Sequence, residues 1–426
     1  MRHFDYREDG TLYAEDVSLV ELADVVGTPA FVYAEATVDR HLQVFDAAFD
    51  GHPHLVCYAM KANSSRPVLE LVRRRNAGVD IVSGGELFRA RRAGIPANRI
   101  VFSGVGKTAA EMAYALDEGI LAFNVESEPE LRRLAEVSAS KGLVAPVSLR
   151  VNPDVDPQTH PYIATGLAQA KFGIPMTEAP RLAAWADAQS SLRMDGVDCH
   201  IGSQLTRLPP LLEALESVLD LVDRLRSSGH AIEHIDMGGG LGIPYDQETP
   251  PHPLELGRAV LAKLRGRPER LILEPGRVIV GNAGILLTRV LYRKTTPTKT
   301  FVVVDAAMND LLRPVLYDAQ HEILPVRAGP AENPLVSVDV VGPVCETADC
   351  FAKDRLLPLL EPGDLVAVMS AGAYGHVMSS QYNSRPRAPE IWVSGARFHV
   401  GRRRERYEDL VSGESVPPWF QAGETG

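Results

Sequence analysis

The sequence predicts a (β/α)8 barrel followed by an all-β domain. Between residues 54 and 277, short β-rich runs alternate with helix-compatible stretches, and eight such units in about 220 residues match the size of a (β/α)8 barrel. After Arg277 the runs are β-rich, with turn residues and few long helical patterns. A doubly wound open sheet would alternate in the same way. The barrel is favoured because chemically unusual residues fall at the carboxyl ends of the predicted strands, where barrels place their active sites.

The barrel strands are predicted from short runs rich in β-branched and aromatic residues. They are Leu55–Lys61, Val79–Ser83, Ile100–Ser103, Leu121–Val125, Val147–Asn152, Gly196–Ser203, His234–Gly239 and Leu271–Glu274. The helices predicted between them include Pro67–Arg75, Glu86–Ala93, Pro129–Ser138 and Pro210–Ser228.

The second domain is predicted to be a β-sandwich or β-barrel. Its expected strands are Val278–Ile285, Phe301–Asp305, Leu335–Val341, Asp364–Met369 and Glu390–Val393. We therefore place the barrel at residues 31–277, beginning with the strand-like run Phe31-Val32-Tyr33, and the β domain at 278–426. Residues 1–30 are expected to pack onto the β domain.

Composition favours a protein that acts on a small-molecule substrate. The 426 residues are 45% hydrophobic and 23% charged, and the formal net charge of -11 disfavours a nucleic-acid partner, which needs a basic surface. Residues 1–10 are polar and lack an apolar segment behind a basic start, so no secretory signal or membrane span is expected and the cytoplasm is predicted. The four cysteines are spaced neither as a disulfide framework nor as a zinc site, and no metal is predicted.

Lys61 lies in the run Tyr58-Ala59-Met60-Lys61-Ala62-Asn63, directly after the apolar residues Leu55-Val56-Cys57. A desolvated amine loses its proton more readily, and the neutral amine forms a Schiff base with an aldehyde cofactor such as pyridoxal phosphate (PLP). The alternative is a surface lysine whose aliphatic stem covers apolar neighbours. Two further motifs favour the covalent role.

These motifs are glycine-containing turns after the last two predicted strands. Gly238-Gly239-Gly240-Leu241-Gly242 follows the seventh strand, and Glu274-Pro275-Gly276-Arg277 follows the eighth. Consecutive glycines let backbone N–H groups close around a phosphate, although they also form simple tight turns. Barrels commonly hold phosphate in this region, and Lys61 on the first strand would be adjacent to the eighth. The sequence therefore predicts a PLP site at the barrel mouth.

Two more polar residues follow predicted strands. Glu274 is an acid in the apolar context Leu271-Ile272-Leu273 and needs a cationic partner, either a protonated pyridine nitrogen or a structural arginine such as Arg277. His200 would stack on the cofactor ring, or be a hydrogen-bonded core residue, and Ser203 offers a hydroxyl to phosphate.

In combination, the motifs resemble the fold-type III PLP-dependent amino-acid decarboxylases, and within them the diaminopimelate decarboxylases. Several motifs in the same order are specific, whereas any one alone is not. They span nearly the whole chain: Tyr58–Asn63, Val79–Glu86, Asn152–Gly173, His200–Leu205, Gly238–Tyr245, Glu274–Arg277, Asp305–His321, Gly342–Glu346 and Ala371–Arg387.

The resemblance implies roles for the cofactor-binding residues. Lys61 would carry the imine link to PLP, His200 would stack on the ring, and Glu274 would contact the pyridine nitrogen. Asp80 and Glu86 would be acids near Lys61 and the ring. The phosphate would be held by a set formed of Ser203, Gly239, Gly240, Gly276, Arg277 and Tyr374.

The resemblance also implies the substrate-binding groups. Arg277, Arg313 and Tyr317 would bind the substrate carboxylates, since bidentate arginine suits a planar carboxylate. A spacing of four places Arg313 and Tyr317 on one helical face; the alternative is a surface arginine and a packed tyrosine. Glu346 would pair with the distal ammonium, and Tyr374 would reach substrate as well as phosphate. In the family the Cys345-Glu346 pair enters from the neighbouring subunit, which implies a homodimer.

The implied activity is decarboxylation of meso-2,6-diaminopimelate to L-lysine and carbon dioxide, the last step of lysine biosynthesis. Cys345 would return a proton to the former α-carbon; otherwise it is a small buried hydrophobe. Local departures from the family pattern are Gln320, Thr347-Ala348-Asp349-Cys350 and Gln381, none of them a residue with an assigned role.

Three alternative functions remain open. One is a related decarboxylase for another amino acid, such as ornithine, or for a carrier-bound glutamyl group. Another is an alanine-racemase-like isomerase, which would need a second base and would not need the Cys345-Glu346 or Arg313-Tyr317 pairs. The third is a non-catalytic PLP-binding barrel, which generally lacks a β domain.

Overall fold

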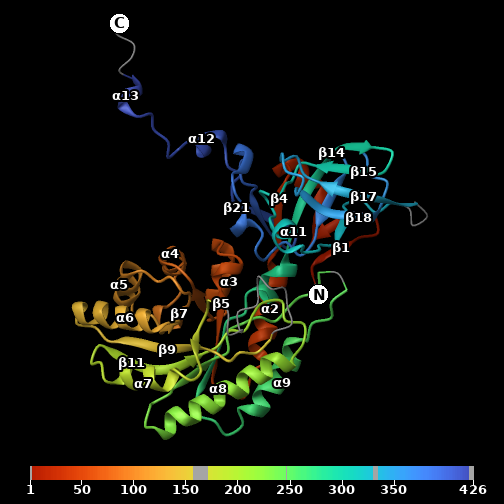
Figure 1. Ribbon diagram of the computed structural model, residues 1–426. Coiled ribbons are helices and arrows are strands. Elements are labelled where there is room, and N and C mark those ends of the chain that lie inside the picture. The colour runs from red at the N-terminus through yellow and green to blue at the C-terminus, as the bar shows by residue number, and fades with distance from the viewer. Residues whose placement is uncertain (1, 157–170, 246, 330–333, 422–426) are drawn as a thin grey trace. The chain divides into compact units, whose positions relative to one another are not determined.

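The computed structural model describes residues 2–156, 171–245, 247–329 and 334–421, and the chain divides into two compact units (Figure 1). The barrel unit comprises Met1–Asp5, Ala34–Ile285 and Met369–Val377, and the β unit comprises Tyr6–Tyr33, Leu286–Val368 and Met378–Gly426. The sequence places a single boundary at 277/278 between its two main domains. In the structure the chain returns to the barrel unit at Met369–Val377.

The barrel unit contains a closed barrel of eight parallel strands, which confirms the barrel over an open sheet. The last strand pairs with the first, with Ile272 opposite Leu55, and β8 pairs with β9, so the ring has no free edge. In the order of pairing, the strands are β5 (His54–Ala59), β6 (Gly78–Ile81), β7 (Ile100–Phe102), β8 (Ala122–Val125), β9 (Ala145–Asn152), β11 (Leu192–Asp198), β12 (His234–Asp236) and β13 (Arg270–Leu273).

Helices follow most barrel strands, as Figure 1 shows for α5, α6, α7 and α8. Their starts are set by side-chain caps: Ser83, Thr108 and Ser127 each accept a hydrogen bond from the N–H three residues on. The barrel unit contains α2 (Glu35–Ala47), α3 (Arg66–Arg74), α4 (Gly84–Arg92), α5 (Ala109–Glu118), α6 (Glu128–Lys141), α7 (Ala179–Asp187), α8 (Pro209–Ser227), α9 (Pro253–Lys263), α10 (Arg277–Val280), the 3-10 turns η1 (Met60–Ala62), η2 (Ala97–Arg99) and η4 (Gly281–Ala283), and the short strand β10 (Ile174–Pro175).

Several barrel strands end before the polar residues that the sequence placed on them. β5 ends at Ala59, so Lys61 lies in η1, and β11 ends at Asp198, so His200 and Ser203 lie in the following loop. β12 ends two residues before Gly238, whose φ of +62° cannot continue a strand. The functional side chains are therefore presented by the turns that leave the strands.

The β unit contains a mixed sheet in which β14 pairs antiparallel with β15 and β19, and β15 pairs parallel with β17. Four elements cross a boundary between the units: β1 (Phe4–Tyr6), β4 (Ala30–Ala34), β14 (Gly284–Thr295) and η5 (His376–Met378). The other elements of the β unit are β2 (Leu12–Ala14), β3 (Val17–Ser18), α1 (Leu19–Val26), β15 (Thr300–Val304), α11 (Arg313–Tyr317), β16 (Ile323–Pro325), β17 (Leu335–Val341), β18 (Cys350–Pro358), β19 (Leu365–Val368), η6 (Tyr382–Ser384), β20 (Glu390–Ser394), β21 (Arg397–Arg402), α12 (Tyr407–Leu410) and α13 (Pro418–Gln421).

One predicted strand is wrong. Val278–Ile285 was expected to be a strand because it is rich in β-branched residues, but α10 and η4 occupy most of it and β14 begins only at Gly284. Ile279 and Val280 are buried, and α10 packs against α2. Tertiary packing has therefore overridden the local strand propensity.

Within the described ranges, no helix combines the length and the apolar character needed to cross a membrane.

Candidate active site

Lys61 and Asp80 form an ion pair at the carboxyl ends of two neighbouring barrel strands. Lys61 Nζ lies 2.8 Å from Asp80 Oδ2. Asp80 belongs to β6 and is fully buried, whereas the Lys61 side chain is one-third exposed. The amine is therefore fixed in position while part of its side chain stays accessible.

The protonation of Lys61 differs from the expectation that desolvation frees the amine. Burial acts to lower the pKa of Lys61, but the charges of Asp80 and Glu274 and the phenol of Tyr374 outweigh it and hold the pKa above its ordinary value. Lys61 is therefore an ammonium in this structure. Its reaction with an aldehyde requires loss of a proton, and Asp80 is the hydrogen-bonded group that accepts from it.

The glycine turn after β12 packs closely against the loop after β11. A Cβ on Gly239 would lie 2.1 Å from the carbonyl oxygen of Glu274, and one on Gly240 would lie 2.4 Å from that of Gly202. Gly240 also has a φ of +113°, which side-chain-bearing residues rarely adopt. Only glycine fits these two positions, because a side chain would clash with the neighbouring backbone.

His200 lies against the glycine turn as a neutral imidazole. Gly239 N donates to His200 Nδ1 at 3.0 Å, so Nδ1 carries no proton and the ring hydrogen is on Nε2. Burial lowers the pKa of His200 well below its ordinary value, and the charges of Lys61 and Arg150 act in the same direction. The ring is thus uncharged, and the hydrogen bond from the glycine turn holds it in place.

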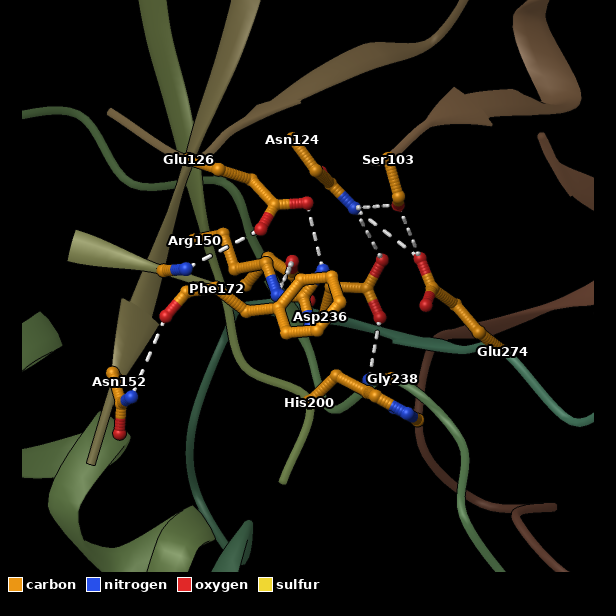
Figure 2. A network of polar contacts seen from close by, with 12 residues as sticks. Ser103, Asn124, Glu126, Arg150, Asn152, Phe172, His200, Asp236, Gly238 and Glu274 are labelled. Atoms are coloured by element: carbon orange, nitrogen blue, oxygen red, sulfur yellow. Dashed lines mark hydrogen bonds and ion pairs between the residues drawn. The ribbon is translucent and has the colours of Figure 1, made fainter. Parts of the chain in front are cut away.

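Glu274 is buried among amide and hydroxyl donors. Its Oε1 accepts from Ser103 Oγ and from Asn124 Nδ2, each at 3.2 Å (Figure 2). Burial, followed by the charges of Asp236 and Asp80, raises the pKa of Glu274 well above its usual range. Among the described residues, Glu274 and Arg277 do not form the ion pair that the sequence left open as an alternative, and Arg277 hydrogen-bonds to Tyr245 and Ser203.

Arg277 is buried and held by neighbouring hydroxyl and aromatic groups. Its Nη1 donates to Tyr245 Oη at 2.5 Å and its Nη2 to Ser203 Oγ at 3.2 Å. The guanidinium carbon lies 4.9 Å from the ring centroid of Tyr374, a cation–π distance. Arg277 therefore brings together Ser203 and Tyr374, both predicted from the sequence as phosphate ligands.

Tyr374 reaches this site on the segment that returns from the β unit. Its backbone N donates to the carbonyl oxygen of Ala62 at 2.8 Å, and its φ of +55° lies in the left-handed region. Asn63 reinforces the contact by donating to Gly372 O at 3.2 Å. A strained backbone is thus held directly beside the Lys61 turn.

Glu86, the other predicted acid, lies at the start of α4. Its carboxylate accepts from Val82 N at 2.7 Å. Burial raises the pKa of Glu86 to about 7, the Val82 N–H opposes this, and the charge of Asp80 adds to it. Glu86 is therefore partly protonated near neutral pH.

The residues of the barrel unit fit PLP. The site offers an amine in the turn that leaves a buried strand, a turn that only glycine can make, a neutral imidazole beside that turn and a buried acid that, within the described residues, has no arginine partner. A protonated pyridine nitrogen would supply the cation that Glu274 lacks. The buried Asp80 Oδ1 has no partner within the described residues and offers a further acceptor.

In the β unit, Arg313 and Tyr317 begin and end the helix α11, as the spacing of four predicts. Arg313 is buried, with its Nη1 3.2 Å from His321 Nε2, whereas Tyr317 is half-buried.

Cys345 and Glu346 lie on an exposed loop of the β unit between β17 and β18. Cys345 N donates to Asn383 Oδ1 at 3.3 Å, and Tyr382 Oη donates to the Glu346 carboxylate. Asp349 fixes the loop by accepting from Met308 N and Val344 N, each at 2.7 Å. Cys345 is thus not a buried hydrophobe in this chain.

The departures from the family pattern lie in the β unit. Gln320 is exposed, and Gln381 donates to Glu405 at 2.9 Å. Most of the motif Asn152–Gly173, including His160-Pro161-Tyr162, lies outside the described residues.

Sequence reasoning missed the residues that surround Glu274: Ser103, Asn124, Asp236 and, further along the network, Glu126 and Arg150. A signal was present. Asn124 and Asp236 are polar residues inside apolar strand runs, Phe123-Asn124-Val125 and Ile235-Asp236-Met237, and burying such groups requires hydrogen-bond partners.

Comparison with known proteins identifies the family. Residues 35–281 match the family model described as the pyridoxal-binding domain of pyridoxal-dependent decarboxylases. The chain is 53% identical over 418 residues to a diaminopimelate decarboxylase of Pseudomonas aeruginosa and 51% identical over 419 residues to one of Vibrio cholerae, covering 98% of this chain and 100% of each relative.

A solved structure shows the same fold. The crystal structure of diaminopimelate decarboxylase from Helicobacter pylori, complexed with L-lysine, has a TM-score of 0.89 and 44% identity, and covers 92% of this chain and 98% of that one. Together with the match of the pyridoxal-binding domain, these relatives establish a PLP-dependent decarboxylase. The chain belongs to the diaminopimelate decarboxylase family.

Proposed function

We propose that the barrel-mouth residues described above hold PLP in this enzyme, which decarboxylates meso-2,6-diaminopimelate to L-lysine and carbon dioxide in lysine biosynthesis. Identity above 50% over essentially the full length of curated relatives is the observation that carries the reaction. We also propose residues 31–277 as the cofactor-binding domain, a range supported by the family match at 35–281.

Each residue of the cofactor site is assigned a task. Lys61 provides the amine that bonds to the cofactor and Asp80 takes up its proton, supported by their 2.8 Å contact. His200 supports the ring as a neutral imidazole, and Glu274 faces the pyridine nitrogen. Phosphate is assigned to the set Ser203, Gly239, Gly240, Gly276, Arg277 and Tyr374, with Glu86 as an outer acid near the ring.

When bound, PLP supplies an aldehyde carbon for the substrate amine and an electron-withdrawing ring that accepts the electron pair of the cleaved carbon–carbon bond. Glu274 would face the ring nitrogen and favour its protonated form, which would make the bound group a stronger electron acceptor. The bond to the carboxyl carbon breaks, carbon dioxide leaves, and a proton must then be returned to the α-carbon.

We assign the return of that proton to Cys345, with Arg277, Arg313, Tyr317 and Tyr374 binding the substrate carboxylates and Glu346 the distal ammonium. The exposed position of Cys345 and Glu346 on their loop supports a role at a surface shared with another chain. We therefore propose a homodimer in which each subunit completes its partner's active site.

Replacing Cys345 tests this assignment. We expect Cys345→Ala to retain PLP but to lose about 10²- to 10⁴-fold in kcat, the usual contribution of a positioned proton donor. Cys350→Ala is the matched control, because Cys350 lies five positions later and donates to a backbone carbonyl at 3.2 Å. Full turnover by Cys345→Ala would remove Cys345 from the mechanism.

The dimer is tested by mixing two inactive variants. Lys61→Ala and Cys345→Ala lie on different parts of a shared site, so a mixture that exchanges subunits should recover up to about a quarter of the wild-type sites. Sedimentation should show a dimer for each variant. A mixture that stays inactive after demonstrated exchange would contradict the shared site.

The substrate is tested directly. Purified protein with PLP is incubated in parallel with meso-2,6-diaminopimelate, L-ornithine and D-alanine, and the released carbon dioxide and the amine product are measured. Lysine from the first substrate alone is expected. Putrescine from ornithine would favour the related decarboxylase, and L-alanine from D-alanine would favour the isomerase.

The cytoplasmic location stays a prediction from the sequence. Fractionation of cells against a known cytoplasmic marker would test it.

A further inference from the structure

Three buried carboxyl groups meet at the ends of three consecutive strands of the barrel. Asp198 ends β11, Asp236 ends β12, and Glu274 follows β13. One carboxylate oxygen from each lies within 4.8 Å of those of the other two, and no group is more than 4% exposed. Among them, only Glu274 has been given a role above.

Asp236 and Glu274 are joined by one amide. Asn124 Nδ2 lies 3.4 Å from Asp236 Oδ2 and 3.2 Å from Glu274 Oε1, and the other oxygen of Asp236 accepts from Gly238 N at 2.8 Å (Figure 2). Asp236 is therefore held between the glycine turn and the amide that also holds Glu274. A movement or change of charge at Asp236 acts directly on Glu274.

The cations near this pair are already engaged by other acids. Arg150 Nη1 lies 2.8 Å from Glu126 and its Nε lies 3.7 Å from Asp198, while Lys61 pairs with Asp80. Within the described residues, neither Asp236 nor Glu274 forms an ion pair with lysine or arginine. Two ionised carboxylates this close and this buried would repel each other strongly.

The pKa directions agree with this geometry. Burial raises the pKa of Asp236 to about 6 and that of Glu274 well above its usual range. The charge of Asp236 raises the pKa of Glu274 further, whereas hydrogen bonding with Glu274 lowers that of Asp236, as expected when one proton lies between them. The titratable or charged groups that interact with the pair come from β5, η1, β6, β9, β11 and the loop after β11: Cys57, Lys61, Asp80, Arg150, Asp198 and Cys199.

We propose that Asp236 is a positioning residue for Glu274, and that the two carboxyl groups share one proton in the cofactor-free protein. The inference rests on the proposed role of Glu274 toward the pyridine nitrogen. A protonated ring would bring the positive charge that the pair lacks, so the pair as a whole, rather than Glu274 alone, favours protonation of that nitrogen. If residue 236 only accepted hydrogen bonds, an uncharged side chain would serve there as well as an aspartate.

The test is a double-mutant cycle on the cofactor-free protein, with Asp236→Asn, Glu274→Gln and the double variant. Each single variant is expected to raise the thermal midpoint at pH 8 by a few degrees, because the protein then no longer has to keep the one negative charge of the proton-sharing pair buried without a cation. The gain is expected to shrink at pH 5, where the pair takes up a second proton. The double variant should gain less than the sum of the singles, since that one charge can be removed only once.

Asp236→Asn is compatible with the fold. The asparagine oxygen can still accept from Gly238 N, and the amide has nearly the same shape as the carboxyl group it replaces. Asp310→Asn is the matched control, since Asp310 is an equally buried acid in the β unit. The shift in thermal midpoint caused by Asp310→Asn should add fully to the shift caused by Asp236→Asn.

A second measurement separates this inference from the function of Glu274. Titration with PLP, followed by absorbance, should show an affinity about tenfold lower for Asp236→Asn and lower still for Glu274→Gln. If Glu274→Gln bound PLP with full affinity, the proposed contact of Glu274 with the pyridine nitrogen would be overturned. The double-mutant cycle on the cofactor-free protein would still test whether Asp236 and Glu274 share a proton. Additive singles, or an Asp236→Asn variant destabilised equally at pH 5 and pH 8, would overturn the shared proton.

Discussion

Buried acidic residues of the barrel unit and exposed ones on its outer helices respond in opposite ways to their surroundings. On the outer surface, the hydrogen bond from Arg181 lowers the pKa of Glu128 to about 2, and that from Arg73 does the same for Glu70. In the interior, burial raises the pKa of Asp236 to about 6, although it has hydrogen bonds from Gly238 and Asn124.

The difference shows that hydrogen bonds alone do not decide the charge of an acid in this molecule. A surface carboxylate keeps its hydration and gains an arginine, whereas an interior carboxylate loses water and meets other carboxylates. Even Glu130, paired with the buried Lys107 at 2.7 Å, has a pKa raised by burial. The buried acids of the barrel unit therefore include groups that can exchange protons near neutral pH, whereas the exposed acids Glu70 and Glu128 stay ionised there.

The largest effect is expected from the interior cation that bears the chemistry. Lys61→Ala should lower turnover by about 10³-fold or more, because the amine bonds to the cofactor, and it leaves Asp80 buried without its partner. Steady-state kinetics measure the loss of turnover, and absorbance spectra show whether the band of the lysine-linked cofactor has disappeared. Lys141→Ala, which removes a partly exposed lysine paired with Asp117, is the control and should turn over normally.

The next effect concerns a buried ion pair with no assigned catalytic role. Lys107→Met should destabilise the protein by about 3–5 kcal/mol, because Glu130 is then left buried without a cation. The Lys107 ammonium also donates to Gly104 O and Asn124 O, which lose a donor. Urea unfolding of the cofactor-free protein measures the change. An unchanged free energy of unfolding would mean that the interior tolerates an unpaired charge, and it would contradict the difference between buried and exposed acids.

A smaller effect is expected in the pH dependence of stability. Burial raises the pKa of Asp310 to about 7, above its ordinary value of 3.8. The folded protein therefore holds a proton that the unfolded chain has lost, so this contribution is complete below pH 3.8 and is lost as the pH rises to about 7. It should amount to about 2–4 kcal/mol.

Asp310→Asn should remove this slope, because asparagine does not titrate and still accepts from Ala307 N in place of the carboxylate. Urea midpoints between pH 4 and pH 8 measure it. Glu128 should act in the opposite sense, since its lowered pKa gives a contribution that is lost as the pH falls toward about 2. The same slope in wild type and Asp310→Asn would show that the buried acid is not the source.

The smallest effect is expected on the surface. Arg181→Met removes a guanidinium that is half exposed and pairs with Glu128 and Glu178. Its shift of the urea midpoint should be roughly a tenth of that of Lys107→Met, because exposed pairs are screened by water and salt. A shift as large as that of Lys107→Met would show that burial does not separate the two classes.

Much of the fold could be predicted from the sequence because its signals are local. Alternating runs located all eight barrel strands, and Lys61, the glycine turn and Glu274 stood out where those strands end. The failure at Val278–Ile285 has the same origin, since a β-branched run read by itself predicts a strand. The barrel and the residues at its mouth were thus contained in patterns a few residues long.

The electrostatics of the site were not contained in those patterns. Asn124 and Glu274 are 150 positions apart, yet one amide joins Glu274 to Asp236, and Asp80 reverses the effect that desolvation alone would have on the pKa of Lys61. Sequence alone determined which chemical groups end the strands, because strand periodicity and turn residues are local properties. Only closure of the barrel decided their charges, because a pKa depends on every charge nearby in space and on how much water has been excluded.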